Sequence, residues 1–324
     1  MRQIPIEAIT DAAKHVYKAA VRTPLIRLDL PFSSPQGSTP EVYLKLESLQ
    51  PIGSFKIRGA WNAVRKLSAD QLKDGVWTVS AGNAAQGVAF AARLAGVPCS
   101  VMVMDTAPKT KLRSIEKLGA TIVTADYDEC WKTVESHASS RMRGHFVHPF
   151  DDDDFIAGNA TAGLEILEDL PDVDVVVAAL GGGGLLAGIG SALRARKPSV
   201  RLYAAEPETA APLDLSLKRD AASRFEGWTA SFVDGAGGKS VLPSMWPLLK
   251  TLVSGSIVMP LDEIAAAMRK TAERVHVVAE GAGGTAIAAA LSGRCGPGKI
   301  VAVVSGGNID LSRFSELVHA HTNV

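Results

Sequence analysis

Short runs of apolar, often β-branched residues alternate with longer stretches of mixed character along almost the whole chain. Several of the short runs are apolar at both alternating positions, which is typical of strands that are covered on both faces. Between them lie stretches with helical periodicity, such as AAQGVAFAARLAG, PKTKLRSIEKLG and PLDEIAAAMRKTAERV. This alternation predicts an α/β fold with open, twisted, mostly parallel sheets flanked by helices. The runs predicted as strands are Gly75–Ala81, Cys99–Met104, Ala120–Ala125, Asp172–Leu180, Val200–Glu206 and Lys299–Gly307.

The predicted strands fall into two groups, three of them between residues 71 and 146 and another set after residue 172. We therefore expect a large domain of residues 1–70 and 147–324 and a small domain of residues 71–146. Open α/β sheets bind ligands beyond the carboxyl ends of their strands. The expected site is a cleft between the two domains.

The composition narrows the class of protein. Of 324 residues, 47% are hydrophobic and 21% charged, as in globular proteins with a sizeable core. Lys plus Arg and Asp plus Glu number 34 each, a net charge of +0, which argues against a nucleic acid or a membrane surface as the main partner. Cys99, Cys130 and Cys295 form no C-x-x-C pair, so neither a disulfide framework nor a zinc site is expected. With no signal peptide and no apolar run of ~20 residues, the sequence predicts a cytoplasmic protein.

Four consecutive glycines, Gly181–Gly184, separate an apolar run from a helical pattern that begins near Leu185. Glycine lets backbone N–H groups approach an anion closely, and a helix N-terminus adds a positive dipole. The run lacks the Lys-Ser/Thr ending of a nucleotide-binding P-loop and the G-x-G-x-x-G spacing of a dinucleotide site. It therefore favours a site for a monophosphate over the alternative, a flexible turn with tight packing.

Two further strand ends carry small polar residues. Ser80, Ala81 and Gly82 lead to Asn83 at the start of a helix, an arrangement suited to a carboxylate. The stretch SGGN begins at Ser305 and places a hydroxyl at the carboxyl end of the last predicted strand. Each stretch alone is also typical of a turn or a helix cap. Beside the glycine run, they indicate a second anion site and a polar contact in the same crevice.

Lys56 stands in SFKIRGAW (Ser54–Trp61), next to Phe55 and just after the loop QPIG. Alone it is typical of a solvated surface lysine. Together with a phosphate site and a carboxylate site, it indicates pyridoxal 5'-phosphate, because a lysine amine forms a Schiff base with the aldehyde of that cofactor. The cofactor then serves as an electron sink for chemistry at the α-carbon of an amino acid.

The motifs SFKIRGA, SAGNAAQG, GGGGL, AAEP and SGGN occur in the order and spacing of a known family. From RTPLIRL (Arg22–Leu28) to SGGNID (Ser305–Asp310), the chain resembles the pyridoxal-phosphate-dependent threonine/serine dehydratase and serine racemase family. This family has the tryptophan-synthase-β-like fold, called fold type II. The resemblance implies that the cofactor lies in the cleft between the large and the small domain, that the small domain closes over the substrate, and that the protein is a homodimer.

The resemblance also implies roles for individual residues. Lys56 forms the Schiff base and carries a proton on one face of the cofactor ring, with Phe55 packed against the ring and Gly235 on its other side. Asn83 bonds the ring's 3-oxygen. Ser305 meets the pyridine nitrogen, where a hydroxyl in place of a carboxylate suits β-elimination better than transamination. The implied phosphate contacts are Gly181, Gly182, Gly183, Gly184 and Leu185, and the implied substrate contacts are Ser80, Ala81, Gly82, Asn83 and Ala84.

Three positions depart from the family pattern. Ala81 stands where racemases carry a serine as second acid/base, so efficient racemisation is not expected. Ala84 stands where the motif has histidine, which opens space beside the substrate and indicates a β-substituent other than the methyl of threonine: larger, aryl or carboxylate. The family's divalent-cation site (Mg²⁺ or Ca²⁺) is matched by Glu206 and the carbonyl of Ala210. The next carboxylate position is Pro212, so Asp214 would have to replace it.

These features predict a dehydratase (ammonia-lyase) of amino-acid degradation that converts a β-hydroxy amino acid into a 2-oxo acid and ammonia. Its substrate is of the serine/threonine type, with phenylserine and 3-hydroxyaspartate as further candidates. Three alternatives stay open: an amino-acid racemase, a β-replacement enzyme of the cysteine-synthase type, and a non-catalytic amino-acid sensor. In each case the partner is a small-molecule amino acid.

Overall fold

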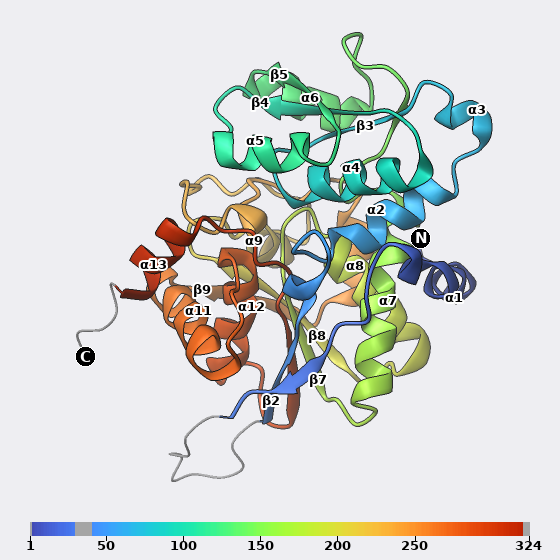
Figure 1. Cartoon of the computed structure of the whole chain (residues 1–324). Helices are drawn as coiled ribbons and strands as arrows, with labels where there is room; N and C mark the ends of the chain where they lie inside the picture. Colours follow the sequence, from blue (N-terminus) through green and yellow to red (C-terminus); the bar gives the residue numbers. More distant parts are fainter. Residues whose placement is uncertain (1, 30–40, 320–324) are drawn as a thin grey trace.

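Two sheets of unequal size form the frame of the computed structural model, which describes residues 2–29 and 41–319 (Figure 1). The larger sheet has the strand order β1-β2-β10-β7-β8-β9, and β1 is antiparallel to β2 while the other neighbours are parallel. Its strands are β1 (Leu25–Arg27), β2 (Glu41–Lys45), β10 (Lys299–Val303), β7 (Val175–Ala179), β8 (Arg201–Pro207) and β9 (Gly255–Met259). The last strand, β10, therefore inserts between the early strand β2 and the central strand β7.

The smaller sheet is parallel throughout and has the order β5-β4-β3-β6. Its strands are β3 (Val76–Val79), β4 (Cys99–Met104), β5 (Thr121–Ala125) and β6 (His145–Phe146). Every residue of the inner strand β3 is buried, whereas the edge strand β5 is half-exposed. In Figure 1 this sheet and helices α4 to α6 form the upper part of the molecule.

Helices cover both faces of the larger sheet. Val176 of β7 packs into an apolar cluster with α7, α8 and α10, whereas its neighbour Val177 packs into a second cluster with α11 and α12. No helix in the described ranges has the length and apolar character needed to cross a membrane. The helices are α1 (Ile6–His15), α2 (Lys56–Arg65), α3 (Ala69–Leu72), α4 (Asn83–Ala95), α5 (Lys109–Glu116), α6 (Tyr127–Ser136), α7 (Asp153–Asp169), α8 (Gly184–Arg196), α9 (Pro212–Arg219), α10 (Trp246–Leu252), α11 (Leu261–Val275), α12 (Gly281–Leu291) and α13 (Leu311–His319), with 3₁₀ turns η1 (Val16–Lys18), η2 (Glu47–Leu49) and η3 (Asp234–Ala236).

Helix α2 lies where the two parts meet and packs against both α4 and α7 (Figure 1). The contact with α7 is close because Gly158 has no side chain: a Cβ there would lie 2.4 Å from the carbonyl oxygen of Arg58. A side chain at Gly158 would push the two helices apart. The tight packing therefore fixes the N-terminus of α2, where Lys56 stands.

The α/β fold with two mostly parallel sheets, predicted from the sequence, is confirmed. Each predicted strand run overlaps an observed strand, but some runs are too long. In the run Asp172–Leu180, for example, β7 begins only at Val175, because Asp172 belongs to a turn in which the backbone N–H of Val173 donates to the carbonyl oxygen of Leu170. Strands β1, β2, β6 and β9 were not predicted; β1 and β6 have only three and two residues, too few to show a periodicity. The domain boundaries stay a prediction.

Candidate active site

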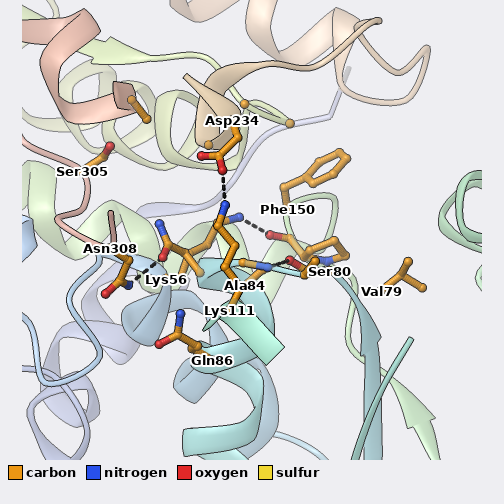
Figure 2. A pocket seen from close by; sticks show the side chains of 18 of the residues that line it. Lys56, Val79, Ser80, Ala84, Gln86, Lys111, Phe150, Asp234, Ser305 and Asn308 are labelled. Atoms are coloured by element: carbon orange, nitrogen blue, oxygen red, sulfur yellow. Dashed lines mark hydrogen bonds and ion pairs between the residues drawn. The ribbon is translucent and has the colours of Figure 1, made fainter. Parts of the chain in front are cut away.

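A cavity of about 500 Å³ lies at the carboxyl ends of strands from both sheets (Figure 2). Ser80 enters it just after β3, Gly181 shortly after β7 and Ser305 shortly after β10. The fold thus brings together strand ends that lie far apart in the sequence, as expected for open α/β sheets. The predicted site residues that line the cavity are Phe55, Lys56, Ser80, Ala81, Gly82, Asn83, Ala84, Gly181, Gly182, Gly183, Gly184, Leu185, Gly235 and Ser305.

Lys56 is the first residue of α2, and its side chain reaches into this cavity (Figure 2). Its Nζ donates a hydrogen bond to the carbonyl oxygen of Pro149 at 2.6 Å and lies 5.3 Å from the ring centre of Phe55. Desolvation by burial lowers the pKa of Lys56 to about 8. A larger share of this amine is therefore neutral and nucleophilic near neutral pH than for an exposed lysine.

The loop before Lys56 is held against the end of the larger sheet. The backbone N–H of Phe55 donates to the carbonyl oxygen of Ser305 at 3.0 Å, and that of Gly307 donates to Gly53 at 2.9 Å. Ser305 is 3% exposed and lines the cavity from β10. These bonds tie the segment before Lys56 to the end of β10, so that Lys56 and Ser305 border the same cavity.

The four glycines form a turn that packs tightly on one side and is open on the other. Gly183 has φ +93° and precedes the 13-residue helix α8, whose N-terminus has no side-chain cap. A Cβ on Gly182 would lie 2.1 Å from the ring of Phe150. The uncapped N–H groups face the cavity and fit a phosphate. The glycines are thus explained both by tight packing and by an anion cradle.

A second helix N-terminus faces the cavity at α4. Ser80 Oγ accepts a bond from the backbone N–H of Gly82 at 3.1 Å, and the first residues of the helix are Asn83 and Ala84. No side chain caps this helix either, so its first N–H groups are available to a carboxylate. The two uncapped N-termini and the amine of Lys56 border one cavity, which fits a ligand with a phosphate and a substrate carboxylate.

Glu280 and Asn308 also line the cavity and were missed in the sequence analysis. Asn83 Nδ2 donates to Glu280 Oε1 at 2.7 Å, and Asn308 Nδ2 donates to Asn83 Oδ1 at 2.7 Å. The two bonds fix the orientation of the Asn83 amide, leaving its second N–H for a ligand. Burial, and secondly the charge of Asp234, raise the pKa of Glu280 to about 8. Asn308 is the last residue of the SGGN motif, whereas the only signal for Glu280 in the sequence was a lone glutamate before the glycines of α12.

Replacing Glu280 with glutamine is expected to change how stability depends on pH in the cofactor-free protein. Between its ordinary pKa of 4.5 and the raised value of about 8, the folded state binds a proton that the unfolded state has lost. In this range the contribution of Glu280 to the free energy of unfolding of the wild type therefore falls as the pH rises, by up to about 1.4 kcal/mol per pH unit. Glutamine keeps the acceptor for Asn83 and removes this contribution.

Urea unfolding from about pH 5 to pH 8 measures the effect. The free energy of unfolding of Glu280→Gln, relative to that of the wild type, should increase as the pH rises. Glu316→Gln, an exposed glutamate of α13, serves as the control and should follow the wild type. Parallel curves for Glu280→Gln and the wild type would show that Glu280 does not titrate in this range.

Gly235 lies in the turn η3 beside an ion pair that joins the two parts of the chain. Asp234 of η3 pairs with Lys111 of α5, and both residues line the cavity (Figure 2). A Cβ on Gly181 would lie 2.8 Å from the carbonyl oxygen of Gly235, so this turn packs directly on the glycine run. The predicted contacts on either side of the cofactor ring, Phe55 and Gly235, therefore border the same space.

Glu206 and Ala210, the predicted cation ligands, lie outside the cavity. Glu206 is fully buried, and its two oxygens accept bonds at 2.8 Å from the backbone N–H groups of Leu213 and Asp214 at the start of α9. Burial raises the pKa of Glu206 to about 7. The carboxylate of Asp214 bonds Lys218 instead. Since the oxygens of Glu206 are bonded to the start of α9 and Asp214 to Lys218, the side chains of this site do not fit a divalent cation.

Comparison with known proteins identifies the family. The model of the family described as "Pyridoxal-phosphate dependent enzyme" matches residues 16–306. An L-threonine ammonia-lyase of Thermotoga maritima is 39% identical over 319 residues, which cover 98% of this chain and 78% of that protein. A catabolic L-threonine dehydratase of Staphylococcus aureus is 36% identical over 312 residues, with 94% of this chain and 88% of that protein covered.

Solved structures agree with these matches. Maize serine racemase superposes with a TM-score of 0.87 at 30% identity, covering 99% of this chain and 98% of that one. Threonine deaminase isoform 2 of Solanum lycopersicum superposes with a TM-score of 0.85 at 29% identity, covering 98% and 93%. The uncapped glycine cradle, the second uncapped helix and the desolvated Lys56 fit the cofactor that the family name states. The chain therefore belongs to the pyridoxal-phosphate-dependent enzyme family, in its fold type II threonine/serine dehydratase branch.

Proposed function

We propose that the protein is a pyridoxal-phosphate-dependent dehydratase (ammonia-lyase) that converts a β-hydroxy amino acid of the serine/threonine type into a 2-oxo acid and ammonia. One observation carries the proposal: a desolvated lysine amine stands in one cavity with two uncapped helix N-termini. This arrangement accommodates a cofactor phosphate and a substrate carboxylate on either side of a base. The threonine ammonia-lyases among the relatives support the same reaction.

When bound, pyridoxal phosphate withdraws electrons from the α-carbon of the amino acid. Lys56 holds the cofactor and takes the proton from the α-carbon, since burial lowers the pKa of its amine to about 8 and a larger share of it is unprotonated than for an exposed lysine. The hydroxyl of Ser80 and the uncapped backbone N–H groups of Asn83 and Ala84 orient the substrate carboxylate, and Gly82 shapes the turn between them. Ala81, in the same turn, bounds the substrate on this side.

The remaining contacts hold the cofactor. Asn83, fixed by Glu280 and Asn308, donates to the 3-oxygen of the ring. The hydroxyl of Ser305 meets the ring nitrogen and, being neutral, does not supply the charge that would keep this nitrogen protonated. The backbone of Gly181–Gly184 and Leu185 holds the phosphate, and Phe55 and Gly235 border the two faces of the ring.

Racemisation is the second candidate function, favoured by the likeness to serine racemase. It needs a proton donor on the ring face opposite Lys56. The residue at the expected position is Ala81, whose methyl group carries no proton for transfer. This places dehydration first, with β-replacement and a non-catalytic sensor as weaker alternatives.

Release of 2-oxo acid and ammonia from β-hydroxy amino acids tests the proposed function. The holoenzyme is expected to form both products in equal amounts from at least one of L- and D-serine, L- and D-threonine, threo- and erythro-3-hydroxyaspartate and phenylserine. The enantiomer of each substrate is measured in parallel. Conversion to the enantiomer without ammonia would identify a racemase, and no product from a protein with bound cofactor would rule out simple dehydration.

Removal of divalent cations is expected to leave this activity within about twofold of its starting value. The reason is that Glu206 caps α9 and does not form part of a cation site. Activity is measured after dialysis against a chelator and again after adding Mg²⁺ or Ca²⁺. Loss on chelation with recovery on adding either ion would contradict this assignment of Glu206.

We also propose that residues 71–146 act as a small domain that closes over the substrate. The ion pair between Lys111 in this part and Asp234 in the rest of the chain supports a contact across the site. The homodimer and the cytoplasmic location stay predictions of the sequence analysis.

A further inference from the structure

One wall of the cavity is apolar and belongs to the smaller sheet. Val79 at the end of β3 and Val134 of α6 are members of one apolar cluster, and Met104 at the end of β4 and Phe150 pack against it. All four residues line the cavity, and Figure 2 shows Val79 and Phe150 on the same side of it. The wall adjoins the proposed carboxylate site, because Ser80 directly follows Val79.

Trp131 of α6 extends this wall toward the larger sheet. It lines the cavity and packs against the apolar cluster around α7 and α8. Its indole Nε1 donates a hydrogen bond to Glu135 at 2.9 Å, one turn further along α6. Since its one polar atom is already bonded, the part of Trp131 left for a ligand is apolar.

Ala84 adds a small apolar surface beside the proposed carboxylate site. It stands in the first turn of α4, lines the cavity and is 4% exposed. Its methyl group occupies little volume and offers no hydrogen bond. Ala84 and the apolar wall therefore give the space next to the substrate a largely apolar lining, in which Gln86 and Thr106 are the uncharged polar side chains not assigned to the cofactor or the carboxylate.

The charged residues of the cavity leave no free cation for a second carboxylate. Within the described residues, the charged side chains that line it are Lys56, Lys111, Asp234 and Glu280. Lys111 pairs with Asp234, Glu280 accepts a bond from Asn83, and Lys56 is assigned to the cofactor and the base. An acidic substrate side chain would have to displace Asp234 from Lys111 to gain an ion pair, and would otherwise lose its hydration without compensation.

We infer that the β-carbon of the substrate carries an apolar group larger than methyl, either aryl or branched alkyl, and that Ala84 and Trp131 determine this preference. That the substrate carries a leaving hydroxyl rests on the proposed function. The preference for a large apolar side chain rests on the apolar wall of the cavity alone. Burial of apolar substrate surface against such a wall favours the larger side chain, since one methylene in a hydrophobic pocket changes kcat/KM by about 10- to 200-fold.

The holoenzyme's kcat/KM for phenylserine, L-threonine and 3-hydroxyaspartate tests the preference. Phenylserine is expected to exceed L-threonine by at least about 10-fold, and 3-hydroxyaspartate to fall at least about 10-fold below L-threonine. A value for L-threonine or 3-hydroxyaspartate equal to or above that for phenylserine would overturn the inference and leave the dehydratase function intact.

Variants of Ala84 and Trp131 test whether these residues determine the substrate preference. Ala84→Leu fills the space and Trp131→Ala removes the wall, so each is expected to lower the ratio of kcat/KM for phenylserine to that for L-threonine by at least about 10-fold. Trp131→Phe should restore most of the ratio. Trp246→Ala, a tryptophan of α10 outside the cavity lining, is the control and should not change it. Both substrates are measured on the same preparation of each variant, so a smaller fraction of folded enzyme does not change the ratio. An unchanged ratio in Ala84→Leu and Trp131→Ala would overturn the inference.

The binding of amino acids that cannot be dehydrated tests the side-chain preference independently of the proposed reaction. L-Phenylalanine, L-alanine and L-aspartate lack the leaving hydroxyl, and their binding is followed by the absorbance of the bound cofactor. The Kd for phenylalanine is expected to be at least about 10-fold below that for alanine, with aspartate the weakest. This order without turnover of any β-hydroxy amino acid would support the inference and refute the proposed function. Equal binding of alanine and phenylalanine would overturn the inference.

Discussion

Lys56→Ala is expected to lower the release of 2-oxo acid and ammonia by at least about 10³-fold. The variant loses both the amine that holds the cofactor and the base that takes the α-proton. Lys111 also lines the cavity but cannot take over either role, because its ammonium group is paired with Asp234. Lys56→Arg keeps the positive charge and should be equally inactive, since a guanidinium does not deprotonate in this pH range.

The matched control is Lys66→Ala, at the other end of the same helix, where Lys66 forms a surface ion pair with Asp154. This variant should retain activity within about twofold, because exposed ion pairs contribute little. Steady-state rates and the absorbance of the bound cofactor are measured for each protein. Activity of Lys56→Ala above a tenth of the wild-type value would refute Lys56 as the base.

Arg58→Leu is expected to reduce the free energy of unfolding by about 3–5 kcal/mol. Arg58 is 0% exposed and donates to Glu47 at 2.7 and 2.8 Å and to Glu165 at 2.6 and 3.0 Å. Lys45, also fully buried, donates to Glu165 at 2.7 Å. Although burial opposes it, the charge of Arg58 holds the pKa of Glu47 below its usual value, so this carboxylate is ionised at neutral pH. Leucine would leave an uncompensated negative charge in the core.

Urea unfolding at neutral pH measures this loss, with Arg313→Leu as the matched control. Arg313 forms an exposed pair with Glu316 on α13, and its loss should change the free energy of unfolding by less than about 1 kcal/mol. If Arg58→Leu lowers the free energy of unfolding by less than about 1 kcal/mol, Glu47 and Glu165 must rearrange or take up a proton when the arginine is lost. Because Arg58 lies two residues from Lys56, the same variant is also expected to weaken cofactor binding.

The parts of the site that could be predicted from the sequence are those in which consecutive residues carry the chemistry. Gly181–Gly184 before a helix indicates an anion cradle on its own, and SFK and SAGN add a base and a second anion site. The larger β-branched runs likewise predicted the inner strands, since a strand buried on both faces has a distinctive pattern. These signals need no knowledge of which segments meet in space.

The parts of the site that could not be predicted depend on contacts between residues that lie far apart in the sequence. Glu280 bonds Asn83 from almost 200 positions away, and a lone glutamate before glycines carries no signal of that contact. The charge of Arg58 in SFKIRGA is explained only by Glu47 and Glu165, which come from η2 and α7. The predicted cation site finds no support in the fold for the same reason: Glu206 matches the motif, but its oxygens accept bonds from the N-terminus of α9.

The most direct test of Lys56 as the centre of the site is to locate the cofactor on the chain. The holoenzyme is reduced with borohydride and digested, and the peptides are analysed by mass spectrometry. The predicted result is a pyridoxyl phosphate group on Lys56 in the wild type and on no peptide of Lys56→Ala. Attachment to another lysine, or the absence of any modified peptide from an enzyme that still releases ammonia and 2-oxo acid, would contradict the assignment.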